Sequence, residues 1–288
     1  GAEVLGIEPA DTVAAAARQR GVRTEQVFFD LASAARLRET YGEADLIFAL
    51  NVLAHVPDPN EVMAGVATLL APNGSAHIEV PSLVELLRRT AFDTIYHEHH
   101  SYFSLTALDE LAHRHGLRIA DCESVEIHGG SLHVEIRHAA RTKPSANVGR
   151  MLESEAKAFR EETFRMFAAR LESRRTWVRE QISGNRPCAA YGAAAKGIVL
   201  LNVYALDESW VECIADISPH KQNRFVPGTG QRIISPEELA EREVGLCVIL
   251  PWNLMEEITD RLTDFVERGG TLRSSMPPSM LPTSAVRP

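Results

Sequence analysis

Short apolar runs alternate with stretches of helical periodicity through the first half of the chain. Four apolar runs predict buried strands, at residues 4–7, 27–29, 45–50 and 75–80. Between them lie three stretches whose apolar residues recur with the period of a helix, at residues 12–20, 31–40 and 60–70. Strands that alternate with helices are typical of a parallel, doubly wound sheet. The pattern therefore predicts an α/β domain at the start of the chain.

The pattern changes in the middle of the chain. After a predicted helix at 105–115, two apolar strands at 118–127 and 131–137 are separated by a short connection, which predicts an antiparallel hairpin at the edge of the sheet. Residues 147–182 are charged, and their apolar positions follow helical spacing without a strict heptad. We expect them to form a long amphipathic linker helix, whole or broken once.

The alternation of strands and helices then restarts. Further strands are predicted at 187–191, 211–216, 245–250 and near 271. Further helices are predicted from residue 194, at 236–241 and at 254–268. We therefore divide the chain into an α/β domain over residues 1–146, a helical linker over 147–186 and a second, smaller Rossmann-like domain over 187–288.

Composition narrows the class of protein. The chain has 288 residues, a formal net charge of −9 and a pI near 5.7, which disfavours non-specific binding to nucleic acid. No apolar run is long enough to cross a bilayer, and the first residues lack the pattern of a secretory signal, so we expect a cytoplasmic protein. The four cysteines are far apart without CxxC spacing, which predicts free buried thiols.

Polar side chains follow three of the predicted strands. Glu8 follows the first strand, Asp30 the second and Asn51 the third. Because ligands of a parallel sheet bind outside the carboxyl ends of its strands, these three residues are candidate contacts for a nucleoside cofactor. Glu8 has an alternative role as the cap of the helix that begins after Pro9.

A glycine-rich turn normally lies ahead of the ribose-binding acid in such domains. No turn of this kind precedes Glu8. We therefore expect the first domain to be incomplete at its N-terminus, with a first strand, its glycine-rich loop and a helix belonging to a longer protein.

The residues from 95 to 104 concentrate histidine, tyrosine and glutamate side chains. His97, His99 and His100 with Glu98 resemble metal ligands, but an extended segment would place them on two faces, and the HExxH spacing is absent. A purely structural cluster is a second interpretation. We favour acid–base chemistry, because the unperturbed pKa of histidine lies near neutrality and a neighbouring carboxylate or phenol can tune it.

The second domain contributes one glycine-rich turn and a few basic residues. Residues 192–197 lie where a strand passes into a helix, a place that favours an anion such as pyrophosphate, and Lys196 adds a positive charge. The alternative is a small-residue turn that allows close helix packing. Lys221 and Arg224 are further candidates for contact with phosphate.

Motifs from both halves of the chain resemble those of one known family. They are NVLAHVPD at 51–58, TIYHEH and SYFS within 94–104, HGGSL at 128–132, YGAAAKG at 191–197, KQ, RF and PGT within 221–229, and LPWN at 250–253. The sequence resembles the sugar C-methyltransferases that use S-adenosylmethionine and act on nucleotide-linked 4-keto-deoxysugars, in pathways to branched sugars such as mycarose and kijanose. The family's fold is a class I methyltransferase domain joined to a second Rossmann-like domain.

The resemblance implies a reaction and roles for residues in it. A base removes a proton from the carbon beside the ketone, and the resulting enolate attacks the methyl group of S-adenosylmethionine. The resemblance implies that His99 is the base. It places Tyr96 and Glu98 beside it, to orient the base or stabilise the enolate. His97 and His100 are neighbours without a direct role.

Other residues complete the expected site. His55, just beyond the strand that ends at Asn51, is expected near the reacting end of the cofactor, or it only bonds to the backbone. Ser131, together with Lys196, Lys221 and Arg224, is a candidate contact for a nucleotide-diphosphate sugar. No metal is expected here, because the family's zinc belongs to a cysteine-rich domain that usually precedes this region.

Two alternatives stay open at this point. One is a methyltransferase that acts at carbon or oxygen of another small molecule. The other is a non-catalytic binding or scaffold protein without a complete cofactor site, which the lack of a glycine-rich loop favours and the retention of the residue 96–104 cluster opposes.

Overall fold

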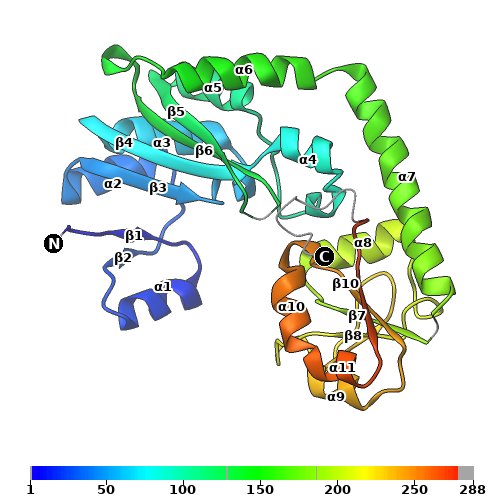
Figure 1. Ribbon diagram of the computed structural model, residues 1–288. Helices are drawn as coiled ribbons and strands as arrows, with labels where there is room; N and C mark the ends of the chain where they lie inside the picture. The colour runs from blue at the N-terminus through cyan, green and yellow to red at the C-terminus, as the bar shows by residue number, and fades with distance from the viewer. Residues whose placement is uncertain (1, 128, 186, 278–288) are drawn as a thin grey trace. The chain divides into compact units, whose positions relative to one another are not determined.

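The structure is a computed structural model that describes residues 2–127, 129–185 and 187–277. Its residues group into two compact units (Figure 1). Unit 1 comprises Gly1–Val84 and Glu98–Phe159, and unit 2 comprises Glu85–His97 and Arg160–Pro288. The predicted linker is broken once and shared between the units, because α6 (Ala146–Ala158) belongs to unit 1 and α7 (Glu161–Ser183) to unit 2.

Unit 1 begins with a small parallel sheet of its own. Strands β1 and β2 are two residues long each and pair in parallel. The elements are β1 (Gly6–Ile7), α1 (Asp11–Gln19), β2 (Thr24–Glu25) and α2 (Leu31–Tyr41). The predicted strand at 27–29 is wrong: the chain there is not paired, and the Phe28 side chain is 73% exposed. A run of three apolar residues before a helix cap does not require a sheet neighbour.

The main sheet of unit 1 has the order β3-β4-β6-β5. β3 pairs in parallel with β4, and the antiparallel pairing of β5 with β6 confirms the predicted hairpin; His128 in its turn lies outside the described residues. The single sheet expected for the first four strands is therefore two sheets. The elements are β3 (Ala44–Leu50), α3 (Pro59–Leu69), β4 (Leu70–Pro81), α5 (Leu105–Arg114), β5 (Leu117–Val125) and β6 (Ser131–His138).

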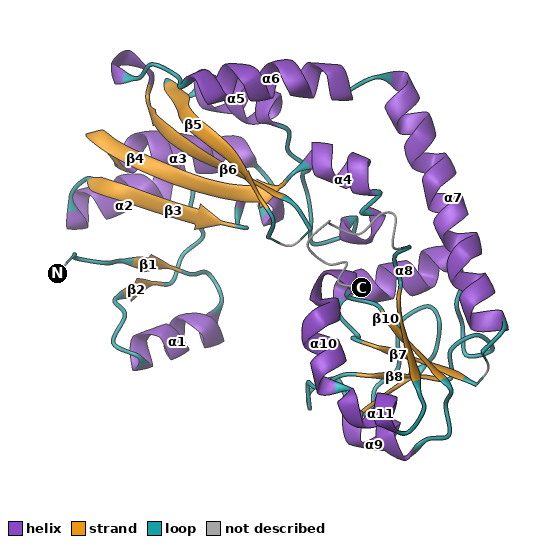
Figure 2. Ribbon diagram, in the orientation of Figure 1, coloured by secondary structure: helices purple, strands orange, loops and turns teal. Residues whose placement is uncertain are grey.

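One face of this sheet carries the core of unit 1. Apolar residues of α3, α5 and α6 pack on β4, β5 and β6, as the ribbon in Figure 2 shows for the helices on that sheet. The edge strand β3 joins this core only through Ile47 and Ala49. Its alternate residues Leu46, Phe48 and Leu50 are 50%, 63% and 51% exposed, because side chains alternate between the two faces of a strand.

Unit 2 is a five-stranded sheet in the order β11-β10-β7-β8-β9, with every pairing parallel. One apolar cluster covers each face, as a doubly wound sheet requires. The elements are β7 (Cys188–Tyr191), α8 (Ala195–Tyr204), β8 (Cys213–Ala215), β9 (Arg232–Ile234), α9 (Pro236–Glu241), β10 (Leu246–Ile249), α10 (Met255–Arg261), α11 (Thr263–Glu267) and β11 (Thr271–Ser274).

The α/β fold class predicted for both halves is confirmed. β9 was not predicted, and the predicted helix at 254–268 is two helices that meet at Leu262. The segment between β4 and α5 was also not predicted to be helical; it contains α4 (Leu83–Arg89) and a short 3₁₀ turn, η2 (Phe92–Thr94). The four cysteines are free and buried, as their spacing predicted.

Gly65 in α3 should resist substitution. A Cβ there would lie 2.9 Å from the backbone oxygen of Asp30 and 3.0 Å from the Phe29 ring. We expect Gly65→Ala to lower the free energy of unfolding by about 1–3 kcal/mol, as overpacking does. Gly149→Ala in α6 is the matched control, because a Cβ there meets nothing within 4 Å; it should raise stability by about 0.5–1 kcal/mol. Urea denaturation of both variants checks the contrast, and equal effects would contradict it.

Candidate functional site

Two polar residues of the candidate site, Asn51 and His55, follow β3 at the carboxyl end of this strand. Asn51 follows β3 with a positive φ of 56°, a conformation that asparagine tolerates better than most residues. The turn η1 (Leu53–His55) comes next. The backbone oxygen of Ala54 in this turn accepts from the amides of His100 (2.8 Å) and Ser101 (3.3 Å). The end of the Tyr96–Ser104 motif is therefore held against η1.

His55 and His99 lie together in unit 1. Their ring centroids are 4.8 Å apart in an edge-on arrangement, and the His99 ring also lies 6.1 Å from the ring of Tyr102. The Nδ1 atom of His55 is 3.0 Å from the carbonyl oxygen of Glu98. A carbonyl only accepts, so Nδ1 carries the hydrogen, which leaves Nε2 of neutral His55 as an acceptor. The backbone bond expected for His55 is thus present, and its place near the reacting end of the cofactor stays a prediction.

The chain passes from unit 2 into unit 1 within the motif, between His97 and Glu98. Tyr96 therefore belongs to unit 2, whereas Glu98 and His99 belong to unit 1. His97 and Glu98 form a turn, so the extended segment assumed from the sequence is wrong. The described residues contain no group of three or more His, Cys, Asp or Glu side chains placed to hold one metal ion.

A buried carboxylate lies beside Asn51 that the sequence analysis missed. Glu79 in β4 is 7% exposed, and its Oε1 atom accepts from Nδ2 of Asn51 at 3.0 Å. The backbone N–H of Asn51 also donates to the backbone carbonyl oxygen of Glu79 at 2.8 Å. The available signal was the single acidic residue of the predicted strand at 75–80, between Ile78 and Val80. A buried carboxylate is retained at a cost, which makes it a candidate for contact with a cation or a hydroxyl group.

Glu8 and Asp30 follow the small sheet of unit 1, and each has a local partner. Glu8 Oε1 accepts from the Ala10 amide at 2.8 Å, but Ala10 is itself the N-cap of α1 and no side chain caps this helix, so the capping role expected for Glu8 is wrong. Asp30 caps α2: its Oδ1 accepts from the Ser33 amide at 2.7 Å, and this bond holds the pKa of Asp30 below its ordinary value. No hydrogen bond or ion pair joins Glu8, Asp30 and Asn51 to one another in the part of the chain described.

The candidate substrate residues are divided between the units: Ser131 belongs to unit 1, whereas Lys196, Lys221 and Arg224 belong to unit 2. Ser131, the first residue of β6, is fully buried, and its hydroxyl donates to the Ile127 carbonyl oxygen at 3.2 Å. Lys221 pairs with Asp216 at 3.1 Å, and Arg224 has an exposed side chain in the loop that follows β8. These roles stay predictions.

Lys196 lies in the first turn of α8, as the turn at 192–197 predicted. Its ammonium is 5.9 Å from the centroid of the Trp252 ring. The pKa of Lys196 is lowered, because the effect of burial exceeds that of the nearby Asp93 carboxylate, which raises it. A Cβ at Gly197 would lie 2.6 Å from the Gly192 carbonyl oxygen, and one at Gly192 would lie 2.5 Å from Pro251 Cδ, so the close packing proposed for this turn is confirmed; anion binding stays a prediction.

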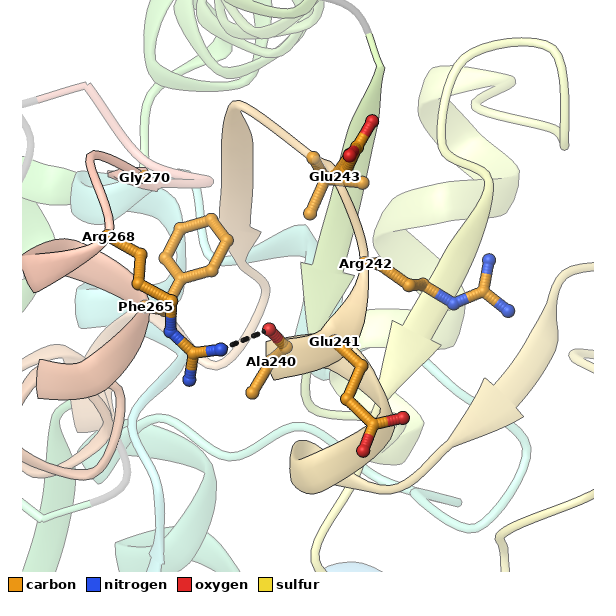
Figure 3. A pocket seen from close by; sticks show the side chains of 8 residues that line it. Ala240, Glu241, Arg242, Glu243, Phe265, Arg268 and Gly270 are labelled. Atoms are coloured by element: carbon orange, nitrogen blue, oxygen red, sulfur yellow. Dashed lines mark hydrogen bonds between the residues drawn. The ribbon is translucent and has the colours of Figure 1, made fainter.

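A surface hollow of about 340 Å³ lies elsewhere in unit 2 (Figure 3). It is lined by residues 240–244 and by Phe265, Arg268 and Gly270, and Arg268 donates across it to the Ala240 carbonyl oxygen at 2.7 Å. These residues precede β10 and β11, so the hollow is at the amino ends of those strands. Ligands of a parallel sheet bind at the opposite end.

Comparison with known proteins identifies the family. The chain belongs to the C-methyltransferases: the family described as "C-methyltransferase C-terminal domain" matches residues 126–277, and the family described as "Methyltransferase domain" matches residues 1–121. C-methyltransferase NovU of Streptomyces niveus is 38% identical over 279 residues, which cover 94% of this chain. The chain spans 66% of the length of that relative.

Solved structures show weaker similarity. The PH0226 protein from Pyrococcus horikoshii is 17% identical with a TM-score of 0.35, over 48% of this chain and 72% of its own. Magnesium protoporphyrin IX methyltransferase from Synechocystis, solved with bound S-adenosylmethionine, is 15% identical with a TM-score of 0.34, over 48% and 60%. Similarity at this level supports no conclusion about the site. None of the helices described has an apolar stretch of the length that a bilayer requires.

The contact of His55 with the Glu98 carbonyl makes a prediction that does not depend on activity. His55→Asn keeps an N–H donor near the position of Nδ1, whereas His55→Ala removes it. We expect amide hydrogen exchange in residues 98–101 to speed up about tenfold in the alanine variant and to change little in the asparagine variant, as local opening becomes easier. Exchange that is equally fast in both variants would show that the hydrogen bond does not hold the segment.

Proposed function

We propose that the chain is the catalytic part of an S-adenosylmethionine-dependent C-methyltransferase, with His99 as its base. The observation that carries the proposal is the pairing of His99 with His55, whose tautomer is set by the Glu98 carbonyl, in a chain of this family. Imidazole groups held at the carboxyl end of an α/β sheet suit proton transfer near neutral pH.

Unit 1 offers carboxylate and amide oxygens that suit the polar groups of the cofactor. S-Adenosylmethionine carries ribose hydroxyls, an ammonium group and a sulfonium centre, all of which favour carboxylate acceptors. Glu8 follows β1 with one oxygen engaged by Ala10, and Glu79 and Asn51 lie together at the ends of β4 and β3. Asp30 contributes less, because its carboxylate already caps α2. We assign Glu8, Asn51 and Glu79 to the cofactor, which supplies an electrophilic methyl group when bound.

The residues of the chain then divide the work on the substrate. A ring nitrogen of His99 accepts the proton from the carbon beside the substrate ketone, and the electron pair of the broken C–H bond passes into the enolate. His55 holds the Glu98 backbone and thereby the segment that carries His99. Tyr96, as a phenol, is suited to donate to the enolate oxygen.

The substrate class follows from the family resemblance and from the charge of unit 2. We propose a nucleotide-linked keto-deoxysugar. Arg224 presents an exposed guanidinium, and Lys221 an ammonium that is shared with Asp216, both on the loop after β8. A diphosphate favours such groups.

Proton removal can be tested separately from methyl transfer. Wild-type protein incubated in D2O with a nucleotide-linked 4-keto-deoxysugar should exchange the proton beside the ketone, and His99→Asn should slow this exchange by at least about 100-fold. Mass spectrometry of the sugar measures the exchange. His113→Asn, a change on the exposed end of α5, is the control and should exchange like wild type. Normal exchange in His99→Asn would remove His99 from the mechanism.

The two roles of Glu8 can be separated by paired variants. Glu8→Gln keeps an oxygen that can accept from the Ala10 amide but loses the charge, whereas Glu8→Ala loses both. If Glu8 binds the cofactor as a carboxylate, both variants should raise the Kd for S-adenosylhomocysteine by about tenfold, close to 1.4 kcal/mol. Calorimetric titration measures it. A Gln variant with unchanged affinity would leave Glu8 only its bond to the Ala10 amide.

A further inference from the structure

The sheet of unit 2 has a defined place for a ligand. The chain leaves β7 toward β8 on one side, while β10 pairs with β7 on the other side. A doubly wound sheet binds its ligands where the strand order reverses in this way, outside the carboxyl ends of the two central strands. In unit 2 this crevice lies between the turn after β7, which begins at Gly192, and the loop after β10, which contains Pro251 and Trp252.

This place is filled by the chain itself. The turn η2 packs against α8, the helix that starts at the crevice, and Phe92 belongs to the same apolar cluster as Ala193, Leu200 and Leu250. The Phe92 ring lies 5.3 Å from the ring of Tyr204. The segment that contains η2, which precedes the motif in the chain, thus lies at the position that a nucleotide takes in other doubly wound sheets.

Asp93 is the polar centre of this contact. Its side chain is fully buried, and Oδ2 accepts from Nε1 of Trp252, in the loop after β10, at 2.9 Å. The second oxygen, Oδ1, has no hydrogen-bond donor among the described residues. The charge of Asp93 acts on Lys196 in the first turn of α8. A buried carboxylate with one hydrogen bond and one nearby cation is costly to keep unless it serves a purpose.

The segment is also held from its other end. Thr90 has a φ of +54°, a strained conformation for a β-branched residue. Arg174, fully buried in α7, donates to the Thr90 carbonyl oxygen at 3.1 Å, and Arg170 donates to the Thr90 hydroxyl at 3.1 Å and to the Leu87 carbonyl oxygen at 2.7 Å. Strain that is held by surrounding contacts is common where a segment must be presented in one conformation.

We propose that the switch-point crevice of unit 2 is the docking site of the chain's own segment Glu85–His97 rather than a nucleotide site, and that Asp93 is the positioning residue that sets where this segment presents Tyr96. Tyr96 lies three residues beyond Asp93, and the chain enters unit 1 two residues later, at Glu98. Lys196 is then the counter-charge of Asp93 and not a contact of the substrate diphosphate. The docking holds without the proposed function, whereas the role of Tyr96 rests on it.

Amide hydrogen exchange of the whole chain tests the docking. In Asp93→Ala the peptide covering residues 85–97 should exchange at least about tenfold faster than in wild type, because its anchor is lost. Asp93→Asn keeps an acceptor for Trp252 and should stay within about threefold of wild type. Trp252→Phe removes the donor, keeps a ring, and should behave like Asp93→Ala; it decides the question if Asp93→Ala does not fold.

Arg268→Ala is the matched control. Arg268 donates to the carbonyl oxygens of Asp264 and Ala240 at the amino ends of β10 and β11, so its loss removes backbone contacts of unit 2 at the end of the sheet opposite the segment. Exchange in residues 85–97 should be unchanged in this variant. An unaffected peptide in both Asp93→Ala and Trp252→Phe, or equal loosening in Arg268→Ala, would overturn the docking proposal.

Inorganic pyrophosphate probes the nucleotide alternative. Added to the wild-type chain, it should leave exchange in residues 85–97 and 192–197 unchanged; a saturable change in either peptide would overturn the proposal. In the methyl-transfer assay, Asp93→Ala should lower kcat by about 10- to 100-fold, the cost of a small misplacement, with an unchanged Kd for S-adenosylhomocysteine. A loosened segment with normal kcat would overturn the positioning role. A wild-type chain that binds no S-adenosylhomocysteine would instead contradict the proposed function, while the exchange result on docking stands.

Discussion

Arg174 lies fully buried in α7. Its guanidinium donates to the carbonyl oxygens of Thr90 and Ser275, so this one side chain joins two segments that are far apart in sequence. Its charge also faces the rings of Phe92 and Tyr204, at 5.2 and 6.0 Å from their centroids. Removing one side of a buried polar contact of this kind costs several kcal/mol, because the groups left behind stay out of water. The arrangement of the Glu85–His97 segment in unit 2 depends on this residue.

The consequence for the site is that one motif is held by two sets of contacts. Unit 2 anchors the residues before Tyr96 through Thr90, Phe92 and Asp93. Unit 1 anchors the residues after it, through the contacts of η1 with Glu98, His100 and Ser101. The proposed base, His99, and the proposed phenol, Tyr96, are three residues apart in sequence and belong to different units.

Most secondary structure of the chain follows from local pattern, and the errors occur where local pattern carries little information. The helix over Pro236–Glu241 was predicted to the residue, because Ser235 caps it and proline suits its first position. The strand expected at 27–29 failed because three apolar residues do not specify a sheet neighbour. The motif drew attention to His99, but no motif singled out the buried acids Glu79 and Asp93, which the structure pairs with Asn51 and Trp252.

By itself the sequence determined the α/β class, the hairpin and the cluster of histidines, since these depend on periodicity, turn residues and side-chain chemistry that are local to the chain. Only the tertiary structure decided that the early strands form two sheets, that His55 faces the Glu98 carbonyl, and that Asp93 reaches Trp252 across 159 positions. Contacts at such separation depend on how whole elements pack. A buried polar group needs a hydrogen-bond partner, and the local sequence pattern does not specify which distant residue provides it.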